Sequence, residues 1–401
     1  MWAVLVIGVG VLSTTLAQSE VLARLPLQNF LKNDLHADRS ASSAFFFWAG
    51  MAWYLKPLAG ILTDAFPLFG SRRRAYILLG ASLAAVLWFV LIVTPRDYHD
   101  MLLMVIAINA FMMIASTVIG GCMVEVAQAT AGSGRLSAVR QVIQQGCIIV
   151  TGPVAGYLAG LAFGWTPAVC GTIMLLLVPV TLLFLRERPM RVNTRALLAN
   201  ARGQLGNIAS ARTMWAAAGL MALFYIAPGF STVLFYKQQN ELHLATRAQG
   251  YLQLIGGLCG VLAAVAYGFA CRRWNLRVLL IGGLLLSTLV NLGYVFYSSF
   301  DRAQVIDGVN GFGFTLAELA LIDLAVRATP AGSEGVGFSL MVSVRNLALF
   351  GTDWFGSILM DRYHYEFSTL VIANSATTLV AVPLVFLLRR SMVGHRDAEM
   401  R

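Results

Sequence analysis

The stretch RERPMRVNTRALLANARGQLGNIASAR, residues 186–212, is the one long polar segment of this sequence. On either side of it, long apolar stretches alternate with short polar breaks. A helix needs about 20 mostly apolar residues to cross the hydrocarbon core of a bilayer. Because six such stretches precede the segment and six follow it, the pattern predicts two halves of six membrane helices each.

The expected fold is an all-α membrane protein with twelve transmembrane helices in two pseudo-symmetric six-helix bundles. We expect one bundle in residues 1–186, a cytosolic linker in 187–212, a second bundle in 213–390 and a cytosolic tail in 391–401. The expected spans are 2–31, 41–64, 74–95, 99–126, 137–163, 165–186, 213–238, 246–271, 277–298, 302–328, 334–360 and 366–390.

Composition excludes a soluble protein, because 58% of the residues are hydrophobic, 12% are charged and the mean hydropathy is +0.73. The net charge of +10 could indicate a nucleic-acid partner. However, most lysines and arginines lie in the linker, the tail and alternate loops, as the positive-inside rule requires of cytosolic segments. We therefore expect no nucleic-acid partner, and an inner-membrane protein with both termini in the cytoplasm.

Short repeats support the division into halves. NDLH at 33–36 is repeated as NELH at 240–243, and SAVRQ at 137–141 as VSVRN at 342–346. The second pair places Arg140 and Arg345 at equivalent points of the fifth and eleventh spans. Parallel halves of this kind are typical of the major facilitator superfamily, in which the substrate site lies at the midplane.

The segment WYLKPLAGILTDAFPLFGSRRRAY, residues 53–76, resembles the loop signature of that superfamily between the second and third helices. Asp64 at a helix end can pair with an arginine or with the start of a neighbouring helix, while glycines allow close packing and a tight turn. The expected cytosolic gate comprises Gly60, Asp64, Gly70, Arg72, Arg73 and Arg74. The alternative for the arginines is that they only anchor the topology.

The residues of this loop indicate a particular family within the superfamily. KPL before Gly60, followed by DAFPLFG and RRR, resembles the folate-biopterin transporter family. IAPGFSTVLFYKQQNEL at 226–242 and AVRATPAGSEGVGFSLMVSVRNL at 325–347 are similar to other segments of that family. The resemblance extends from about residue 26 to 357. One position departs from it: Gly120 stands where the family's fourth helix usually carries an aspartate, five residues before the retained Glu125.

The resemblance implies a secondary transporter that moves a folate, a pterin or a similar organic anion by alternating access, with symport of protons left open. No phosphate-binding GxxxxGK loop is present, so ATP-driven transport is not expected. The alternatives are a carrier for an unrelated amphipathic metabolite and, from another class, a membrane sensor or enzyme, for which no nucleophile and base set exists. We expect no cofactor, and no metal site because the histidines and cysteines lack metal-ligand spacing.

Ionisable residues inside apolar spans are candidates for substrate binding or coupling, because a charge at the bilayer centre costs at least about 2.5 kcal/mol. Glu20 and Arg24 are four residues apart, so they share a helix face and can neutralise one another. They form either a structural pair or a site at which Arg24 meets an anionic substrate. The other candidates are Lys56, Glu125, Arg140, Glu318, Asp323, Arg345 and Asp353.

Glu318 and Asp323 in the tenth span are five residues apart and therefore do not share a face. One of them can take up the coupling proton, while the other pairs with Arg327. A flat heterocycle also needs aromatic surfaces, for which the seventh helix offers four candidates, although packing inside the bundle is the alternative for each of them. These candidates are Phe224, Tyr225, Phe235 and Tyr236.

Overall fold

The computed structural model describes residues 2–71, 73–130, 133–187, 194–330 and 334–394. Within these ranges the chain forms helices and no strand. It divides into two compact units. Unit 1 comprises Met1–Ala37 and Trp48–Gly203, and unit 2 comprises Asp38–Phe47 and Gln204–Arg401.

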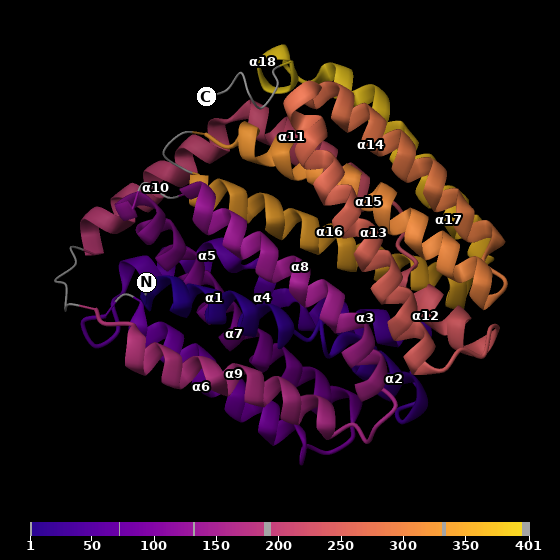
Figure 1. Ribbon diagram of the computed structural model, residues 1–401, viewed down its shortest axis with the longest axis horizontal. Coiled ribbons are helices and arrows are strands. Elements are labelled where there is room, and N and C mark those ends of the chain that lie inside the picture. Colours follow the sequence, from indigo (N-terminus) through magenta and orange to yellow (C-terminus); the bar gives the residue numbers. More distant parts are fainter. Residues whose placement is uncertain (1, 72, 131–132, 188–193, 331–333, 395–401) are drawn as a thin grey trace. The chain divides into compact units, whose positions relative to one another are not determined.

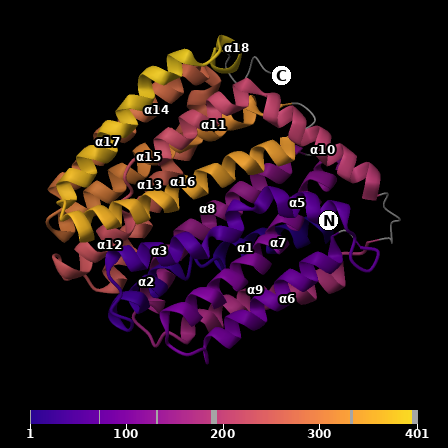
Figure 2. The same cartoon turned by 180° about the vertical axis from the view of Figure 1, so that it is seen from behind.

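Among the described residues, unit 1 contains eight whole helices and the first part of α10, and α6 packs along both α7 and α9 (Figures 1 and 2). These three helices are apolar along their length, so each buries one face against its neighbours. The helices are α1 (Trp2–Leu16), α2 (Arg24–Asn33), α4 (Met51–Tyr54), α5 (Lys56–Ala65), α6 (Arg74–Leu91), α7 (Tyr98–Thr130), α8 (Ser133–Leu158) and α9 (Trp165–Phe184).

Unit 2 contains most of α3 (Arg39–Ala49), the end of α10 (Thr194–Ser210) and the remaining helices. Here α15 packs along α13 and α14, as both ribbon views show (Figures 1 and 2). The helices are α11 (Arg212–Tyr225), α12 (Ser231–Asn240), α13 (Thr246–Arg273), α14 (Leu276–Asn291), η1 (Leu292–Phe296), α15 (Phe300–Ala328), α16 (Glu334–Tyr363), α17 (Phe367–Leu384), η2 (Val385–Leu387) and α18 (Arg390–Val393).

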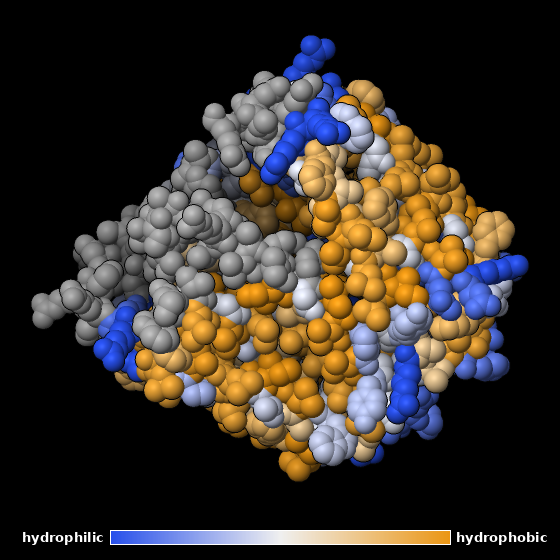
Figure 3. Space-filling model, viewed as in Figure 1, coloured by the Kyte–Doolittle hydropathy of each residue, from blue (hydrophilic) through white to orange (hydrophobic). Residues whose placement is uncertain are grey.

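The helices lie where the sequence predicts membrane spans. Six described segments are long and apolar enough to cross a bilayer, namely Tyr98–Met123, Trp165–Phe184, Thr246–Arg273, Leu276–Phe296, Phe300–Ala328 and Phe367–Leu387. Many of their large apolar side chains are exposed, among them Leu183, Leu262 and Leu289 at 67%, 63% and 67%. Figure 3 shows such hydrophobic residues in orange over α6 and α9 and over α13 and α14. Faces of this kind suit contact with lipid tails.

In the described ranges the first, second and seventh expected spans are interrupted well inside their bounds, which the hydropathy pattern did not predict. The first is broken at residues 17–23 between α1 and α2, and the seventh at residues 226–230 between α11 and α12. We call these the first break and the second break. The second span is divided into α3, α4 and α5 at Gly50 and Leu55.

Helices α16 and α17 satisfy the backbone at the second break, which contains Pro228 and Gly229 and follows the end of α11 at Tyr225. The N–H of Gly229 donates to the carbonyl of Thr352 at 3.1 Å. The Asn374 amide donates to the carbonyl of Pro228 at 2.9 Å. Close approach is required here, because a Cβ built on Gly356 would lie 1.9 Å from the Gly229 oxygen. A non-helical segment is tolerated inside a membrane bundle when its polar groups find partners in this way.

The two halves repeat the same backbone around these breaks at a spacing of 207 residues (24 to 231 and 33 to 240), so α2 and α12 have equal length. After each of them a histidine adopts a left-handed conformation, His36 with φ 52° and His243 with φ 51°. The N–H of Ala37 bonds to the carbonyl of Leu31, and that of Leu244 to Gln238, both at 2.9 Å. The NDLH and NELH repeats therefore mark the same helix-ending turn.

Candidate functional site

A polar cluster in unit 2 joins α11, α15 and α16 around Arg345. Its Nη2 donates to Oε1 of Glu318, its Nε to the hydroxyl of Tyr225 at 3.1 Å, and its Nη1 to Oδ1 of Asn346 at 3.0 Å. The Tyr225 hydroxyl donates to the same Glu318 oxygen at 3.1 Å, and the guanidinium lies 5.1 Å from the Tyr225 ring centroid. The structure thus brings together three residues that the sequence predicted separately.

The guanidinium in this cluster still has hydrogen-bonding capacity. An arginine carries five N–H donors, and Arg345 uses three of them on described partners. One N–H on each terminal nitrogen remains. The side chains of Arg345 and Glu318 are 25% and 21% exposed, so the pair is half-buried. Two remaining donors on one planar group are what a carboxylate needs for a two-point contact.

Asp323 belongs to a separate cluster on the same helix. Its two oxygens accept from Nε and Nη2 of Arg327 at 2.9 and 3.0 Å, and the Tyr267 hydroxyl donates to it at 3.1 Å. The expectation that one of the two carboxylates in the tenth span pairs with Arg327 is confirmed for Asp323. Glu318 has an arginine partner as well, so neither of them is a carboxylate without a cation.

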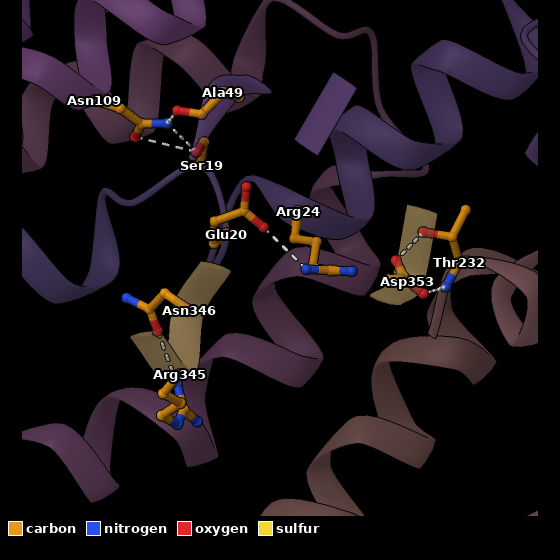
Figure 4. Close-up of polar contacts among 9 residues, drawn as sticks. All are labelled: Ser19, Glu20, Arg24, Ala49, Asn109, Thr232, Arg345, Asn346 and Asp353. Carbon is orange, nitrogen blue, oxygen red and sulfur yellow. Dashed lines mark hydrogen bonds and ion pairs between the residues drawn. The ribbon is translucent and has the colours of Figure 1, made fainter. Parts of the chain in front are cut away.

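The first break in unit 1 carries the pair of Glu20 and Arg24. Arg24 Nη1 donates to Oε2 of Glu20 at 2.9 Å, and the side chains are 19% and 10% exposed (Figure 4). The predicted pairing is confirmed. Beside it, Asn109 of α7 donates to Ser19 Oγ at 2.9 Å and to the Ala49 carbonyl at 2.7 Å, and all three residues are buried. This contact fixes the break against α3 and α7.

Lys56 contacts α7 in unit 1, and Gly120 is part of that helix. The Lys56 ammonium donates to Ser116 Oγ at 3.2 Å and lies 5.3 Å from the Trp53 ring centroid. A Cβ built on Gly120 would meet no atom within 4 Å. The position at which the chain departs from the folate-biopterin pattern therefore borders open space.

Asp353 of α16 closes the second break. Its Oδ1 accepts from the N–H of Thr232 at 2.9 Å and its Oδ2 from the Thr232 hydroxyl at 2.6 Å (Figure 4). The residue is 4% exposed. A carboxylate in the first turn of a helix satisfies free N–H groups and complements the helix dipole. Asp353 thus holds the start of α12 in place.

The four aromatic candidates are all buried, at 4 to 5% exposure. Tyr225 belongs to the Arg345 cluster, and Phe224 packs at 4.9 Å from Tyr225 and 5.7 Å from Phe314 between ring centroids. Phe235 packs edge-on against Tyr236 at 5.6 Å. In this conformation these rings pack within unit 2.

The loop of the expected gate makes the tight turn predicted at Gly70, which has φ 75°. After the turn, the N–H groups of Arg73 and Arg74 donate to Glu187 at 3.1 and 3.0 Å. The carboxylate seen at this helix start is thus Glu187, which sequence reasoning missed. A Cβ on Gly60 would contact Thr117 at an ordinary 3.6 Å.

Several candidates fall outside what the structure describes. Residue 72 and the side chains of Asp64, Glu125 and Arg140 are not among the described parts. Their predicted roles therefore stay predictions.

The sequence also gave no indication of two acidic residues that the fold surrounds with partners. Asp361 of α16 accepts from Arg39 Nη1 at 2.9 Å and from the N–H of Ser40 at 2.8 Å. The hydroxyl of Ser42 lies 2.8 Å from that of Tyr236. Asp307 of α15 accepts from the hydroxyls of two tyrosines. The partners of Asp361 lie more than 300 residues away along the chain, and those of Asp307 lie 13 and 10 residues away, outside helix α15, so no short sequence motif links either set.

Among the described histidine, cysteine, aspartate and glutamate residues, no group of three or more could hold a metal ion. The polar clusters described above are built from ion pairs, tyrosines and amides, and each cluster lies within one of the two units.

A family model described as the BT1 family matches residues 18–401. The chain belongs to the BT1 family. A folate-biopterin transporter of Synechocystis is 24% identical over 92% of this chain and 78% of its own length. Folate transporter 2 of Plasmodium falciparum is 21% identical over 91% and 84%.

Solved structures similar to this BT1 family member are transporters of the major facilitator type. A D-xylose–proton symporter has a TM-score of 0.72 and 15% identity, over 98% of this chain and 99% of its own. The nucleoside transporter NupG has a TM-score of 0.70 and 14% identity, over 97% and 99%. These likenesses show the fold. The family and its relatives show that the chain is a multi-pass membrane transporter and no enzyme.

Proposed function

We propose that the protein is a secondary carrier for a folate, a pterin or a similar organic anion, working by alternating access. The observation that carries this proposal is the half-buried Arg345, which keeps two N–H donors beyond its contacts with Tyr225, Glu318 and Asn346. Relatives named as folate and folate-biopterin transporters support the substrate class.

In this proposal Arg345 binds a carboxylate of the substrate through two hydrogen bonds. Glu318 holds the guanidinium in place and neutralises its charge while the site is empty, since an uncompensated charge inside the bilayer is costly. Arg24, paired with Glu20, is a second candidate cation, in unit 1. A substrate that reaches either arginine competes with that arginine's own carboxylate partner.

The full architecture belongs to the same proposal. It comprises twelve spans in two six-helix bundles, residues 1–186 and 213–390, a linker at 187–212 and a tail at 391–401, with both termini on the cytoplasmic side of the inner membrane. The apolar described segments and the major facilitator fold of similar structures support this arrangement. Labelling of engineered cysteines in residues 190–210 with an impermeant reagent from outside intact cells would contradict it.

The test of the substrate is uptake of labelled folate, a neutral pterin and a panel of other organic anions into transport-deficient cells. Arg345→Ala should raise the KM for folate by about tenfold to a hundredfold, because charged hydrogen bonds contribute about 1.5–3 kcal/mol. The KM for the neutral pterin should change less. Arg302→Ala removes an exposed arginine of α15 and serves as the control. Equal losses for both solutes would assign Arg345 a purely structural role.

The second candidate function is transport of an unrelated small metabolite. It is favoured by Gly120, where the chain lacks the acid usual in folate-biopterin transporters and where the side-chain space is open. No uptake of folate and pterins, together with clear uptake of another solute of the panel, would establish this second function.

A further inference from the structure

Helix α15 contains a carboxyl group whose partners differ from those of Glu20, Glu318, Asp323 and Asp353. Asp307 Oδ1 accepts from the Tyr294 hydroxyl at 2.7 Å, and Oδ2 accepts from the Tyr297 hydroxyl at 2.8 Å. The two tyrosines are 5% and 2% exposed and stack with ring centroids 5.4 Å apart. Neutral phenols thus hold both oxygens of Asp307.

Each tyrosine is in turn held by an amide. Gln238 of α12 donates to the Tyr297 hydroxyl at 2.7 Å, and Asn310 donates to that of Tyr294 at 3.3 Å. Gln249 of α13 donates to Gln238 at 3.2 Å. A chain of hydrogen bonds therefore extends from α13 through α12 and the end of η1 to Asp307, and all of its donors are uncharged.

The neighbouring carboxylates have different partners. Glu318, Asp323 and Glu20 are each paired with an arginine, and Asp353 caps the start of α12. In the described ranges no lysine, arginine or histidine forms an ion pair with Asp307, and its hydrogen bonds come from the two tyrosines.

Charged groups on the surrounding helices are engaged elsewhere or lie at the surface. Lys237 of α12 pairs with Glu241, and Arg302 of α15 donates to Ser298. Asp301 of α15 is exposed. The titratable groups of α13 nearest in sequence to Gln249 are Arg247 and Tyr251, and the Tyr251 ring lies 6.4 Å from that of Phe300. The groups that act directly on Asp307 are Tyr294 and Tyr297.

We propose that Asp307 is the proton-binding residue of the carrier, and that Tyr294 and Tyr297 position it. This inference rests on the proposed function. Removal from water favours the neutral acid, whereas two phenol donors favour the carboxylate, so the group is poised between two states. An acid paired with an arginine lacks this balance, because the neighbouring cation holds it in the charged form.

The proton step needs no other reactant. One proton from the aqueous phase bonds to one carboxylate oxygen of Asp307, the group changes from charge −1 to neutral, and release on the other side reverses the step. Tyrosine hydroxyls and glutamine amides both donate and accept, so the chain of hydrogen bonds can serve either state. With one proton per substrate anion, one pH unit supports at most about a tenfold accumulation.

The test uses the purified full-length protein in liposomes, with folate as the labelled solute. Wild-type protein should accumulate folate several-fold when the outside is one pH unit more acidic. Asp307→Asn should lose this accumulation and keep exchange of labelled for unlabelled folate at equal pH. Asp301→Asn, the same change at an exposed position of the same helix, should behave as wild type. Gradient-driven accumulation by Asp307→Asn would overturn the inference and leave the proposed function intact.

Two further measurements keep the inference testable if Asp307→Asn does not fold or if folate is not the substrate. Tyr297→Phe removes one donor to the carboxylate, so the midpoint of the pH profile of exchange should move to higher pH. An unchanged midpoint would contradict the positioning role. Infrared difference spectra of substrate-free protein should show a carboxylic acid band that titrates with pH and weakens in Asp307→Asn. If wild-type protein shows this band but no folate exchange, the substrate proposal fails and the proton site stands.

Discussion

The first and second breaks are followed by the same backbone structure, but the carboxylate that binds the start of the following helix comes from a different place in each. Each precedes a ten-residue helix, α2 or α12, and a histidine in the left-handed conformation lies three residues after the end of that helix. At the second break, Asp353 binds the start of α12 from another helix and is 4% exposed. At the first break, Glu20 lies within the break and pairs with Arg24, the first residue of α2. The repeat thus preserves the helix ends. Asp353 stabilises the second break, whereas binding at the first break, through Arg24, belongs to the proposed function.

Among the substitutions that test this comparison, removal of the Asp353 carboxylate should have the largest effect on stability. Asp353→Ala takes acceptors from the N–H and the hydroxyl of Thr232 in a buried place. The free energy of unfolding should fall by about 3 kcal/mol, since buried groups without partners are costly. Thermal unfolding of the purified protein in detergent measures this. Asp353→Asn keeps one acceptor and should fall between alanine and wild type, so identical melting of all three would refute the structural assignment.

Exchange of the charges at the first break should have a smaller effect on stability and a large one on transport. Arg24→Ala removes the cation beside Glu20 and should lower stability by about 1–2 kcal/mol. The double variant Glu20→Arg with Arg24→Glu restores opposite charges on the same helix face, so its melting temperature should recover. Uptake should not recover, because the cation has moved by four residues. Recovery of uptake as well would show that the pair is only structural.

An aspartate in place of Gly120 tests whether this position, which borders open space, tolerates a charge. Gly120→Asp should lower stability by less than about 1 kcal/mol, because a Cβ there meets no atom within 4 Å. We expect the variant to shift preference toward pterins in the uptake panel, with Gly120→Asn as the uncharged control. A loss of about 2.5 kcal/mol or more would instead indicate that the position faces lipid.

The smallest expected effects concern the two turns that the halves share. His36→Gly and His243→Gly relieve left-handed backbone strain and increase the entropy of the unfolded chain. Each should change the free energy of unfolding by at most about 1 kcal/mol, and both by similar amounts. Clearly different melting shifts for the two variants would limit the structural repeat to the helices.

The sequence predicted the helices well because apolar length is a local property. It failed at the first break, where residues 17–23 contain no proline or glycine to indicate a helix end and Pro26 lies in the first turn of α2. The seventh span carries Pro228 and Gly229, yet the hydropathy pattern does not distinguish a kink from a break.

The sequence identified several residues of the candidate site, but not the contacts between them. Arg345 and Glu318 were identified because ionisable groups in apolar spans are conspicuous, whereas their pairing depends on how α15 and α16 pack. Asp307 was overlooked because its donors come from residues 294 and 297, and the amide that donates to Tyr297 comes from residue 238, which no spacing rule connects. Glu187 was missed for the same reason, since its partners precede it by more than a hundred positions.

The paired histidines also bear on the origin of the chain. In the described ranges histidine adopts positive φ three times, at residues 36, 243 and 364, and each time the N–H of the next residue bonds to the carbonyl six positions earlier. His36 and His243 are 207 residues apart and follow helices of equal length, α2 and α12, as expected if the two halves arose by duplication of a shorter chain. His364 lies outside that repeat, because the residue 207 positions before it is Tyr157, so the same turn also ends a helix that the duplication does not explain.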